Sequence, residues 1–361
     1  MSYDVAVIPG DGIGIEVVDA TIPLLETLAD GYGFEITLDR YDWGSHRHIE
    51  QGTAMPEDAI DILADYDAIL HGATGHPDVP DTVGAWELVI AIRRAFDQYV
   101  NYRPTYLFNE TFSPLEHAST GDIDIHWIRE NSEGEYADIG GGLDRRRQDA
   151  LAVQTSVYTR EGVERIIRAA FEFAREHNLE QVTSVTKSNA QRFGPVFWDE
   201  VATEVRDDYP DISFESVLVD AMAQHLVIRP EDFDVVVASN LFSDIHTDLT
   251  AAVTGGLGLA PSANLNPDED VPGMFEPVHG SAPDIAGRGI ANPLAEVLSA
   301  GLMLENLGEE EAASAVRTVV EDQLTDDGAP RTVDLGGDNT TSEVVDDLIE
   351  RIGRLSMNRA Q

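Results

Sequence analysis

Lys187 is the first candidate for proton transfer in this sequence. It is the only lysine among 361 residues, although Lys and Arg together number 23. A guanidinium keeps its proton, whereas an amine with a lowered pKa can exchange a proton near neutral pH. We therefore predict a catalytic role for Lys187. The alternative is that Lys187 has no special role and remains by chance in a composition biased toward arginine.

Two aspartates are spaced for metal binding. Asp244 and Asp248 are four residues apart, so in a helix their carboxylates lie on one face about 6 Å apart. Oxygen ligands in this arrangement suit a hard divalent cation, Mg²⁺ or Mn²⁺. An acidic helix face without a ligand is the alternative. His246 points away from this face and is expected to be a packing or surface residue.

Three arginines are candidates for binding an anionic substrate. They are Arg93, Arg103 and Arg129. The planar guanidinium binds carboxylates through two parallel hydrogen bonds, so three such groups would suit a di- or tricarboxylate. Taken singly, each arginine could instead form a surface ion pair.

Two glycine-containing segments could approach a cofactor. The segment 9–14 follows an expected strand, but its glycine spacing differs from the dinucleotide fingerprint and favours a tight strand-to-helix turn. The segment 276–285 could offer backbone amides to phosphates and a carboxylate to a ribose. An ordinary surface loop is the alternative for the second segment.

The elements that would position these residues follow from the hydrophobic pattern. Short apolar runs alternate with amphipathic stretches, which is typical of an α/β protein with a largely parallel sheet. The predicted strands are Val5–Ile8, Ala68–His71, Ile123–Ile128, Val182–Thr186 and Val235–Ala238. One predicted helix covers Glu164–His177. A second begins near Thr340, where Thr340 and Glu343 form a capping box.

The segment Ala137–Arg147 combines three glycines with Arg145, Arg146 and Arg147, and is predicted to be an exposed loop. The alternating stretch Ala150–Tyr158 follows it. We predict that this stretch is a β arm that reaches a partner subunit.

Composition limits the partners and the environment of the chain. There are 67 Asp plus Glu, and the net charge is -44. Molar salt would screen this self-repulsion, so a halophilic source is expected, and nucleic acid and membranes are not expected as partners. The absence of cysteine excludes disulfides and thiolate chemistry. No signal-type segment precedes the first strand, so a cytoplasmic location is expected.

Together these segments resemble the β-decarboxylating dehydrogenases, which act on isopropylmalate, isocitrate, homoisocitrate or tartrate and D-malate. The resemblance covers Val7 to about Val345. It implies an α/β, isopropylmalate-dehydrogenase-like two-domain fold with a central mixed, largely parallel sheet and a dimer arm. The large, cofactor-binding domain would comprise 1–100 plus 256–361, and the small domain with the dimer interface would comprise 101–255. A homodimer, or a tetramer of paired dimers, is implied.

The resemblance also assigns roles to single residues. The three arginines match those that hold the substrate carboxylates. Tyr136 matches the tyrosine that protonates the enolate carbon, and Lys187 matches the base that accepts the hydroxyl proton. Asp244 and Asp248 match the metal ligands of one subunit, and Asp220 matches the ligand that the other subunit supplies.

The expected cofactors are NAD and Mg²⁺ or Mn²⁺, with K⁺ as a further candidate. Members of the family that use NAD carry Asp-Ile where Asp284 and Ile285 stand, and an aspartate there would repel the 2'-phosphate of NADP. The residues that the resemblance assigns to the cofactor are Asn189, Glu276, His279, Gly280, Ser281, Ala282, Asp284, Ile285 and Asn292.

The resemblance places substrate selection at Trp86, Val89 and Ile90. Trp86 is typical of the tartrate/D-malate subgroup, and Glu87 would repel the third carboxylate of isocitrate. We therefore predict a D-malate/tartrate dehydrogenase acting on a hydroxy-dicarboxylate. The apolar Val89 and Ile90 leave 3-isopropylmalate dehydrogenase as the alternative. A non-catalytic acidic metal-binding protein is the alternative outside this class.

Overall fold

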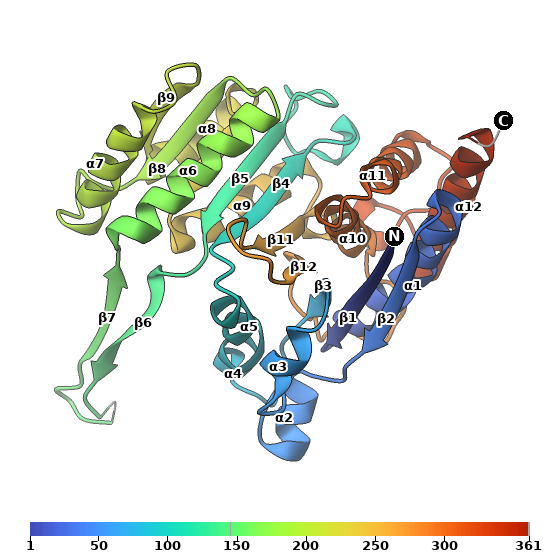
Figure 1. Cartoon of the computed structure of the whole chain (residues 1–361), viewed down its shortest axis with the longest axis horizontal. Helices are drawn as coiled ribbons and strands as arrows, with labels where there is room; N and C mark the ends of the chain where they lie inside the picture. Colours follow the sequence, from blue (N-terminus) through green and yellow to red (C-terminus); the bar gives the residue numbers. More distant parts are fainter. Residues whose placement is uncertain (145, 360–361) are drawn as a thin grey trace. The chain divides into compact units, whose positions relative to one another are not determined.

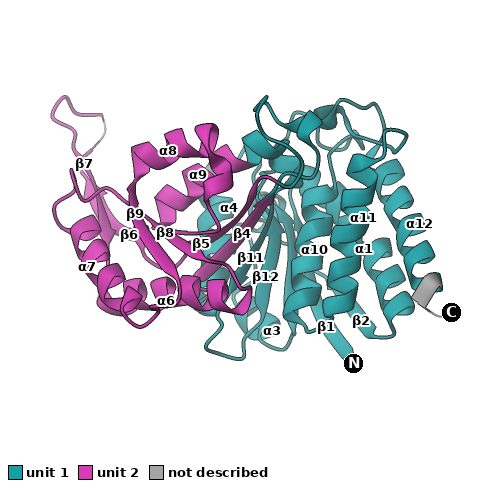
Figure 2. Ribbon diagram, turned by 90° about the horizontal axis from the view of Figure 1, so that it is seen from above, with its two compact units in different colours: residues 1–97, 106–121, 251–361 teal, residues 98–105, 122–250 magenta. Residues whose placement is uncertain are grey.

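The computed structural model describes residues 1–144 and 146–359. The chain forms two compact units, shown in Figure 2. Unit 1 comprises Met1–Asp97, Tyr106–Gly121 and Ala251–Gln361, and unit 2 comprises Gln98–Thr105 and Asp122–Thr250.

Residues 106–121 group with unit 1, whereas the resemblance implies that they belong to the small domain. Their side chains explain the difference. The amide of Asn109 donates to the carbonyl oxygen of Leu324 (2.8 Å), and the guanidinium of Arg317 lies 4.5 Å from the ring centre of Tyr106.

The strands of unit 1 have the order β2-β1-β3-β12-β11. Their bounds are Glu35–Arg40 (β2), Ser2–Gly10 (β1), Ala68–Ala73 (β3), Gly273–Pro277 (β12) and Pro261–Leu265 (β11). Pairing is parallel except between β11 and β12, which are antiparallel. The two predicted strands in this unit are confirmed and extend beyond their apolar runs.

Helices of unit 1 cover these strands (Figure 1). The long ones are α1 (Ile13–Tyr32), α10 (Leu294–Asn306), α11 (Glu310–Thr325) and α12 (Thr341–Arg359). The short ones are α2 (Ser45–Gln51), α3 (Ala59–Leu63), α4 (Asp81–Gly84) and α5 (Ile90–Ala95). A π-helical turn, η1 (Ala85–Val89), joins α4 to α5. The 3₁₀ turns are η2 (Glu110–Phe112), η4 (Leu257–Leu259) and η5 (Val333–Leu335).

The segment 9–14 forms the tight turn between β1 and α1 that its glycines predicted. Gly12 has φ 59°, and a Cβ there would lie 2.1 Å from the carbonyl oxygen of Ser281. Only glycine allows this approach, so the turn and the loop at Ser281 are fitted to each other.

The strands of unit 2 have the order β4-β5-β10-β8-β9. Their bounds are Val100–Tyr106 (β4), Asp124–Glu130 (β5), Val235–Ala238 (β10), Gln181–Thr186 (β8) and Ser213–Leu218 (β9). The pairs from β5 to β9 are parallel. The three strands predicted here are confirmed, and β5 continues far enough to include Arg129.

Unit 2 contains four α-helices among its described residues. They are α6 (Arg160–Glu176), α7 (Gly194–Arg206), α8 (Val219–Ile228) and α9 (Asn240–Thr254), and the 3₁₀ turn η3 (Pro230–Asp232) follows α8. The helix predicted at Glu164–His177 is confirmed as α6. Its buried Ile166, Ile167 and Ala170 lie on the predicted face.

A two-stranded arm extends from unit 2 (Figure 1). Its antiparallel strands are β6 (Gly134–Gly142) and β7 (Ala152–Val157). The glycines we predicted to be in a loop therefore lie in β6. A Cβ on Gly140 would lie 2.2 Å from the carbonyl oxygen of Val153, which explains the glycine inside a strand. Arg145 lies outside the described residues.

No helix that the structure describes is long and apolar enough to span a membrane.

Candidate active site

Asp244 is the centre of a cluster of polar side chains in unit 2. It lies in the second turn of α9, where its Oδ1 forms an ion pair with Arg129 from β5. Arg103 from β4 lies 3.3 Å from the same oxygen and also donates to the hydroxyl of Thr247 (2.8 Å). Both guanidinium groups are buried. The structure thus brings together two of the three predicted arginines and a predicted metal ligand.

Tyr136 completes this cluster from strand β6. Its hydroxyl donates to Oδ2 of Asp244 (2.9 Å), and its ring lies 5.7 Å from the guanidinium carbon of Arg129. Burial and the Asp244 carboxylate raise the pKa of Tyr136 to about 12. The phenol therefore keeps its proton at neutral pH and can act as a donor.

Asp248 lies one turn after Asp244 on α9, as predicted. Partial desolvation raises its pKa, and the neighbouring Asp244 carboxylate adds to this effect. No hydrogen bond to the Asp248 carboxylate is found among the described residues. Two adjacent carboxylates, one of them without a donor, fit a hard divalent cation. Within the described ranges, however, no three His, Cys, Asp or Glu side chains gather closely enough to hold a metal ion.

Lys187 and Asp220 form a second cluster in unit 2. Lys187 follows β8, Asp220 lies in the first turn of α8, and their side chains form an ion pair. The ammonium lowers the pKa of Asp220. The Lys187 side chain is 26% exposed and that of Asp220 is 65% exposed, so the pair is open to solvent on one side. Asn189 lies in the turn after Lys187 and is exposed.

Three glutamates in the stretch Glu130–Glu135 hold the elements around the first cluster. Glu130 accepts hydrogen bonds from the backbone of Ser132 (2.8 Å) and Glu133 (3.0 Å), which shapes the turn between β5 and β6. Glu133 accepts from Thr159 (2.8 Å) at the start of α6. Each glutamate therefore fixes a neighbouring segment.

Glu135 connects the base of the arm to helix α9. Its carboxylate accepts hydrogen bonds from the hydroxyl groups of Tyr158 (2.8 Å) and Ser239 (3.0 Å), and from the backbone N–H of Leu241 (3.1 Å). The adjacent Tyr136 is thereby fixed relative to α9. Sequence reasoning did not identify this residue.

Asn240 is another site residue that the sequence reasoning missed. Its Oδ1 accepts hydrogen bonds from Nη2 (2.7 Å) and Nε (3.2 Å) of Arg129. An available signal was its place two residues after the end of the buried strand β10, because polar residues at the carboxyl ends of parallel strands commonly form sites.

Arg93 lies in unit 1 and binds Glu276. Glu276 is buried, and it also accepts from the amide of Asn264 (2.8 Å) and lies 3.0 Å from Nδ1 of His71. Burial alone would raise the pKa of Glu276, but Arg93 and His71 hold it well below its ordinary range. The structure thus places this predicted cofactor residue in a buried ion-pair cluster.

Two of the residues assigned to substrate selection, Trp86 and Val89, lie in the π-helical turn η1, and Ile90 follows it. The Trp86 ring lies 4.8 Å from the guanidinium carbon of Arg94. Val89 belongs to a buried apolar cluster of unit 1, whereas Ile90 is partly exposed. Such turns widen a helix by one residue and are common at functional sites.

Glu87 differs from our expectation that its charge would face the substrate. Its Oε2 lies 2.9 Å from Nδ1 of His48 and accepts from the backbone N–H of Ala54 (3.1 Å). The carboxylate is therefore directed toward residues 48–54. Sequence spacing did not show this because the π-helical turn changes the direction of its side chains.

The expected cofactor loop of unit 1 packs on the start of α1. The backbone N–H of Ile13 donates to the carbonyl oxygen of Ser281 (2.8 Å), and Ala282 and Ile285 contact the apolar cluster that contains Ile13. Asp284 is exposed, and Gly280 is exposed as well.

His279 and Asn292 lie at either end of the remaining loop. Burial lowers the pKa of His279. Asn292 donates to Asp334 (2.8 Å) and accepts from the backbone N–H of Leu294 (3.0 Å), which fixes the start of α10.

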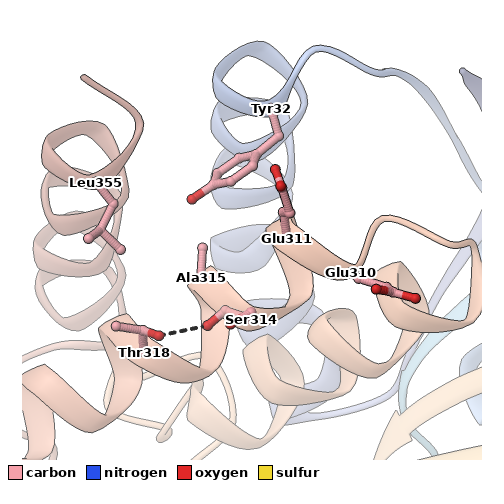
Figure 3. Close-up of a pocket in the computed structure, with 7 residues that line it drawn as sticks. All are labelled: Tyr32, Glu310, Glu311, Ser314, Ala315, Thr318 and Leu355. Atoms are coloured by element: carbon pink, nitrogen blue, oxygen red, sulfur yellow. Dashed lines mark hydrogen bonds between the residues drawn. The ribbon is translucent and has the colours of Figure 1, made fainter. Parts of the chain in front are cut away.

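Two of the pockets formed by described residues lie in unit 1. One, of about 480 Å³, borders the turn after β1 and is lined by Asp11, Gly12, Trp43 and His46 among others. The other, of about 430 Å³, lies between the end of α1 and helices α11 and α12 (Figure 3). Tyr32, Glu310 and Glu311 line it, and it contains none of the predicted site residues.

Known proteins match almost the whole chain in sequence. A family model described as isocitrate/isopropylmalate dehydrogenase matches residues 4–348. A probable tartrate dehydrogenase/decarboxylase of Agrobacterium vitis is 45% identical over 351 residues, covering 97% of this chain and 98% of that protein. The D-malate dehydrogenase (decarboxylating) of Escherichia coli strain K12 is 42% identical, with coverages of 97% and 98%.

Solved structures give the same result. The crystal structure of isocitrate dehydrogenase from Methylococcus capsulatus has a TM-score of 0.86 and 34% identity, covering 97% of this chain and 99% of that chain. The α/β fold predicted from the sequence is therefore confirmed. The chain belongs to the isocitrate/isopropylmalate dehydrogenase family and is an oxidative decarboxylase.

Proposed function

We propose that this enzyme oxidises D-malate or tartrate with NAD and a divalent metal ion, and that the oxidised product loses CO₂. The main support is the cluster in which Arg103, Arg129 and Tyr136 converge on Asp244. These are the residue types that binding a carboxylate substrate next to a metal ion requires.

The residues of the site have different proposed roles. Arg103 and Arg129, together with Arg93, bind and orient the carboxylates of the substrate. Asp244, Asp248 and Asp220 would hold Mg²⁺ or Mn²⁺, which would acidify the substrate hydroxyl when bound. Asp244 already accepts hydrogen bonds from Arg103, Arg129 and Tyr136. When an anionic substrate and a cation bind, the two arginines would also contact the substrate, and Asp244 would also contact the cation.

Two residues move protons in this proposal. The free amine of Lys187 would accept the proton of the substrate hydroxyl, and Tyr136 would donate a proton to the enolate carbon after CO₂ leaves. Bound NAD would supply the hydride acceptor. The raised pKa of Tyr136 supports this role, because it keeps the phenol protonated until the enolate forms.

The choice of NAD rests on Asp284. Its exposed carboxylate can accept hydrogen bonds from the ribose hydroxyls and would repel the 2'-phosphate of NADP. The rest of the proposed cofactor site comprises His279, Gly280, Ser281, Ala282, Ile285 and Asn292, with contributions from Glu276 and Asn189. K⁺ is a further candidate cofactor.

A second copy of the chain is the proposed partner. The arm exposes Ile139, Leu143, Leu151 and Val153 to solvent, and Ile228 and Ile245 are exposed on α8 and α9. Exposed apolar side chains on so acidic a protein indicate an interface. A dimer would also allow Lys187 and Asp220 of one copy to complete the site of the other. The described residues of a single chain bring no three metal-binding side chains together.

The substrate assignment is tested by comparing kcat/KM for D-malate, tartrate and 3-isopropylmalate with NAD and Mn²⁺. We expect D-malate or tartrate to be preferred, because the curated relatives of Agrobacterium and Escherichia coli carry these names and Val89 is buried in the core. A large preference for 3-isopropylmalate would contradict the proposal.

The role of Lys187 is tested with Lys187→Met. Loss of a positioned general base costs about 10²- to 10⁴-fold in rate, and we expect a kcat reduction in this range with bound Mn²⁺ retained. Full activity of this variant would remove Lys187 from the mechanism.

A further inference from the structure

His246 is buried between the two clusters of charged residues in unit 2. It lies on α9 between Asp244 and Asp248, on the opposite face of the helix, and is 3% exposed. Its ring stacks on Trp127, with ring centres 5.9 Å apart. His246 thus points away from the two aspartates, and of the two expected settings, packing or surface, the structure shows packing.

The two ring nitrogens of His246 face different elements. Nδ1 lies 2.6 Å from the carbonyl oxygen of Phe242, four residues earlier in the same helix. Nε2 lies 3.0 Å from the carbonyl oxygen of Val219, the first residue of α8. The second contact joins two helices, and it does so one residue before Asp220.

Helix α9 is also held on another side. Arg103 donates to Thr247 (2.8 Å), and the hydroxyls of Thr105 and Thr250 lie 3.1 Å apart, so strand β4 fixes the helix there. Strand β4 holds α9 on one side, and the contact of His246 with Val219 holds the start of α8 against α9. The Lys187–Asp220 ion pair then depends on the same contact, because Asp220 is adjacent to Val219.

We propose that His246 is a positioning residue that fixes the Asp220 ligand relative to the Asp244 and Asp248 ligands of the same chain. This inference rests on the proposed metal site. If Asp220 serves the site of a second copy, His246 connects the two sites of the dimer, because each chain supplies Asp244 and Asp248 to one site and Asp220 to the other.

Three substitutions separate the two contacts of the ring. His246→Leu removes both ring-nitrogen contacts and keeps an apolar side chain against Trp127. His246→Asn has an amide that reaches only the carbonyl of Phe242, whereas His246→Gln extends far enough to restore a donor to Val219. His177→Leu is the matched control, because Nδ1 of His177 likewise lies 2.9 Å from the carbonyl four residues earlier.

Binding of Mn²⁺ to the whole protein, measured from free Mn²⁺ by electron paramagnetic resonance, gives the first test. Residues that orient metal ligands change affinity by about 10- to 100-fold, so we expect about tenfold weaker binding for His246→Leu and His246→Asn. His246→Gln and His177→Leu should bind like the wild type, and the KM for NAD should be unchanged in all four. Equal losses for His246→Gln and His246→Leu would overturn the inference.

Hydrogen exchange of α8 in the metal-free protein gives a second test that does not depend on metal binding. We expect faster exchange in the peptide covering 219–228 for His246→Leu and His246→Asn, but not for His246→Gln. Unchanged exchange in His246→Asn would show that the contact does not hold α8. Asp248→Asn tests the metal site separately: if it binds Mn²⁺ normally, the proposed ligands are wrong, and the exchange result still decides the role of His246.

Discussion

At the scale of single residues, the site is built from side chains whose charge is balanced by partners far away in the sequence. Asp244 contacts Arg103, Arg129 and Tyr136, which come from three different strands. Its negative charge is therefore stabilised before any ligand binds. Glu130 is a contrasting case, because it is buried without an ion-pair partner among its named contacts and is satisfied by N–H and O–H donors.

The buried carboxyl of Glu130 gives a prediction about pH. Burial raises its pKa from the ordinary 4.5 to about 7. The folded protein then binds more protons than the unfolded chain between these values, so stability falls as pH rises from about 4.5 to 7. The shift corresponds to roughly 3 kcal/mol over this window. Glu130→Gln removes the titration, so the wild type should lose stability relative to the variant across it.

Thermal unfolding of both proteins at fixed salt concentration measures this difference. Glu343→Gln is a control of opposite sign, because hydrogen bonds from Thr340 lower the pKa of the exposed Glu343. That contribution is present above pH 4.5 and is lost as pH falls. A constant difference between wild type and Glu130→Gln from pH 4.5 to 7 would contradict the prediction.

Sequence reasoning at this scale was best where residues are close along the chain. Asp244 and Asp248 could be paired from helical spacing alone. The ion pair of Lys187 with Asp220 and the contact of Glu135 with Ser239 span 33 and 104 residues, so no local pattern could predict them. The orientation of Glu87 was missed because a π-helical turn cannot be distinguished from an α-helix by its apolar residues.

At the scale of elements, helix and strand ends determine where the site residues lie. Strand β5 extends past its apolar run to Glu130 and so carries Arg129. The predicted strand ended earlier because charged residues follow the run. The sequence predicts a loop for the glycines of β6 because glycine disfavours strands, and the close contact of Gly140 with Val153 is not visible in the sequence.

The capping box at the start of α12 was predicted from sequence and is confirmed. The backbone N–H of Glu343 donates to the hydroxyl of Thr340 (3.3 Å), and the N–H of Thr340 donates to the Glu343 carboxylate (2.8 Å). Replacing such a cap with alanine costs about 0.5–2 kcal/mol. We therefore expect Thr340→Ala to lower the free energy of unfolding by this amount.

Urea unfolding of the two proteins tests the cap. Thr318→Ala is a suitable control, because Thr318 lies inside α11 and its hydroxyl donates to the carbonyl of Ser314 in its own helix, as Figure 3 shows. Alanine favours a helix interior, so this variant should not be destabilised. An equal loss of unfolding free energy in both variants would show that removing a threonine, rather than removing the cap, is destabilising.

At the scale of the whole molecule, charge dominates. The 67 acidic residues exceed the 23 basic residues by 44. Many arginines already form exposed ion pairs, including Arg160 with Glu204 and Arg175 with Asp211. Such pairs contribute little each and offset only part of the repulsion. The folded state therefore keeps a large unfavourable electrostatic energy that salt can reduce.

This repulsion predicts that salt stabilises the protein. The Debye length falls from about 10 Å at 0.1 M to about 3 Å at 1 M salt, so repulsion between separated carboxylates is largely screened over this range. We expect the Tm to rise steeply between 0.1 and 1 M NaCl and then to level off. Sodium sulfate at the same ionic strength separates screening from preferential exclusion, since screening predicts similar curves and exclusion predicts a larger rise in sulfate. A Tm that is constant in NaCl and rises only in sulfate would show that apolar burial, rather than relief of the net charge of -44, controls the response to salt.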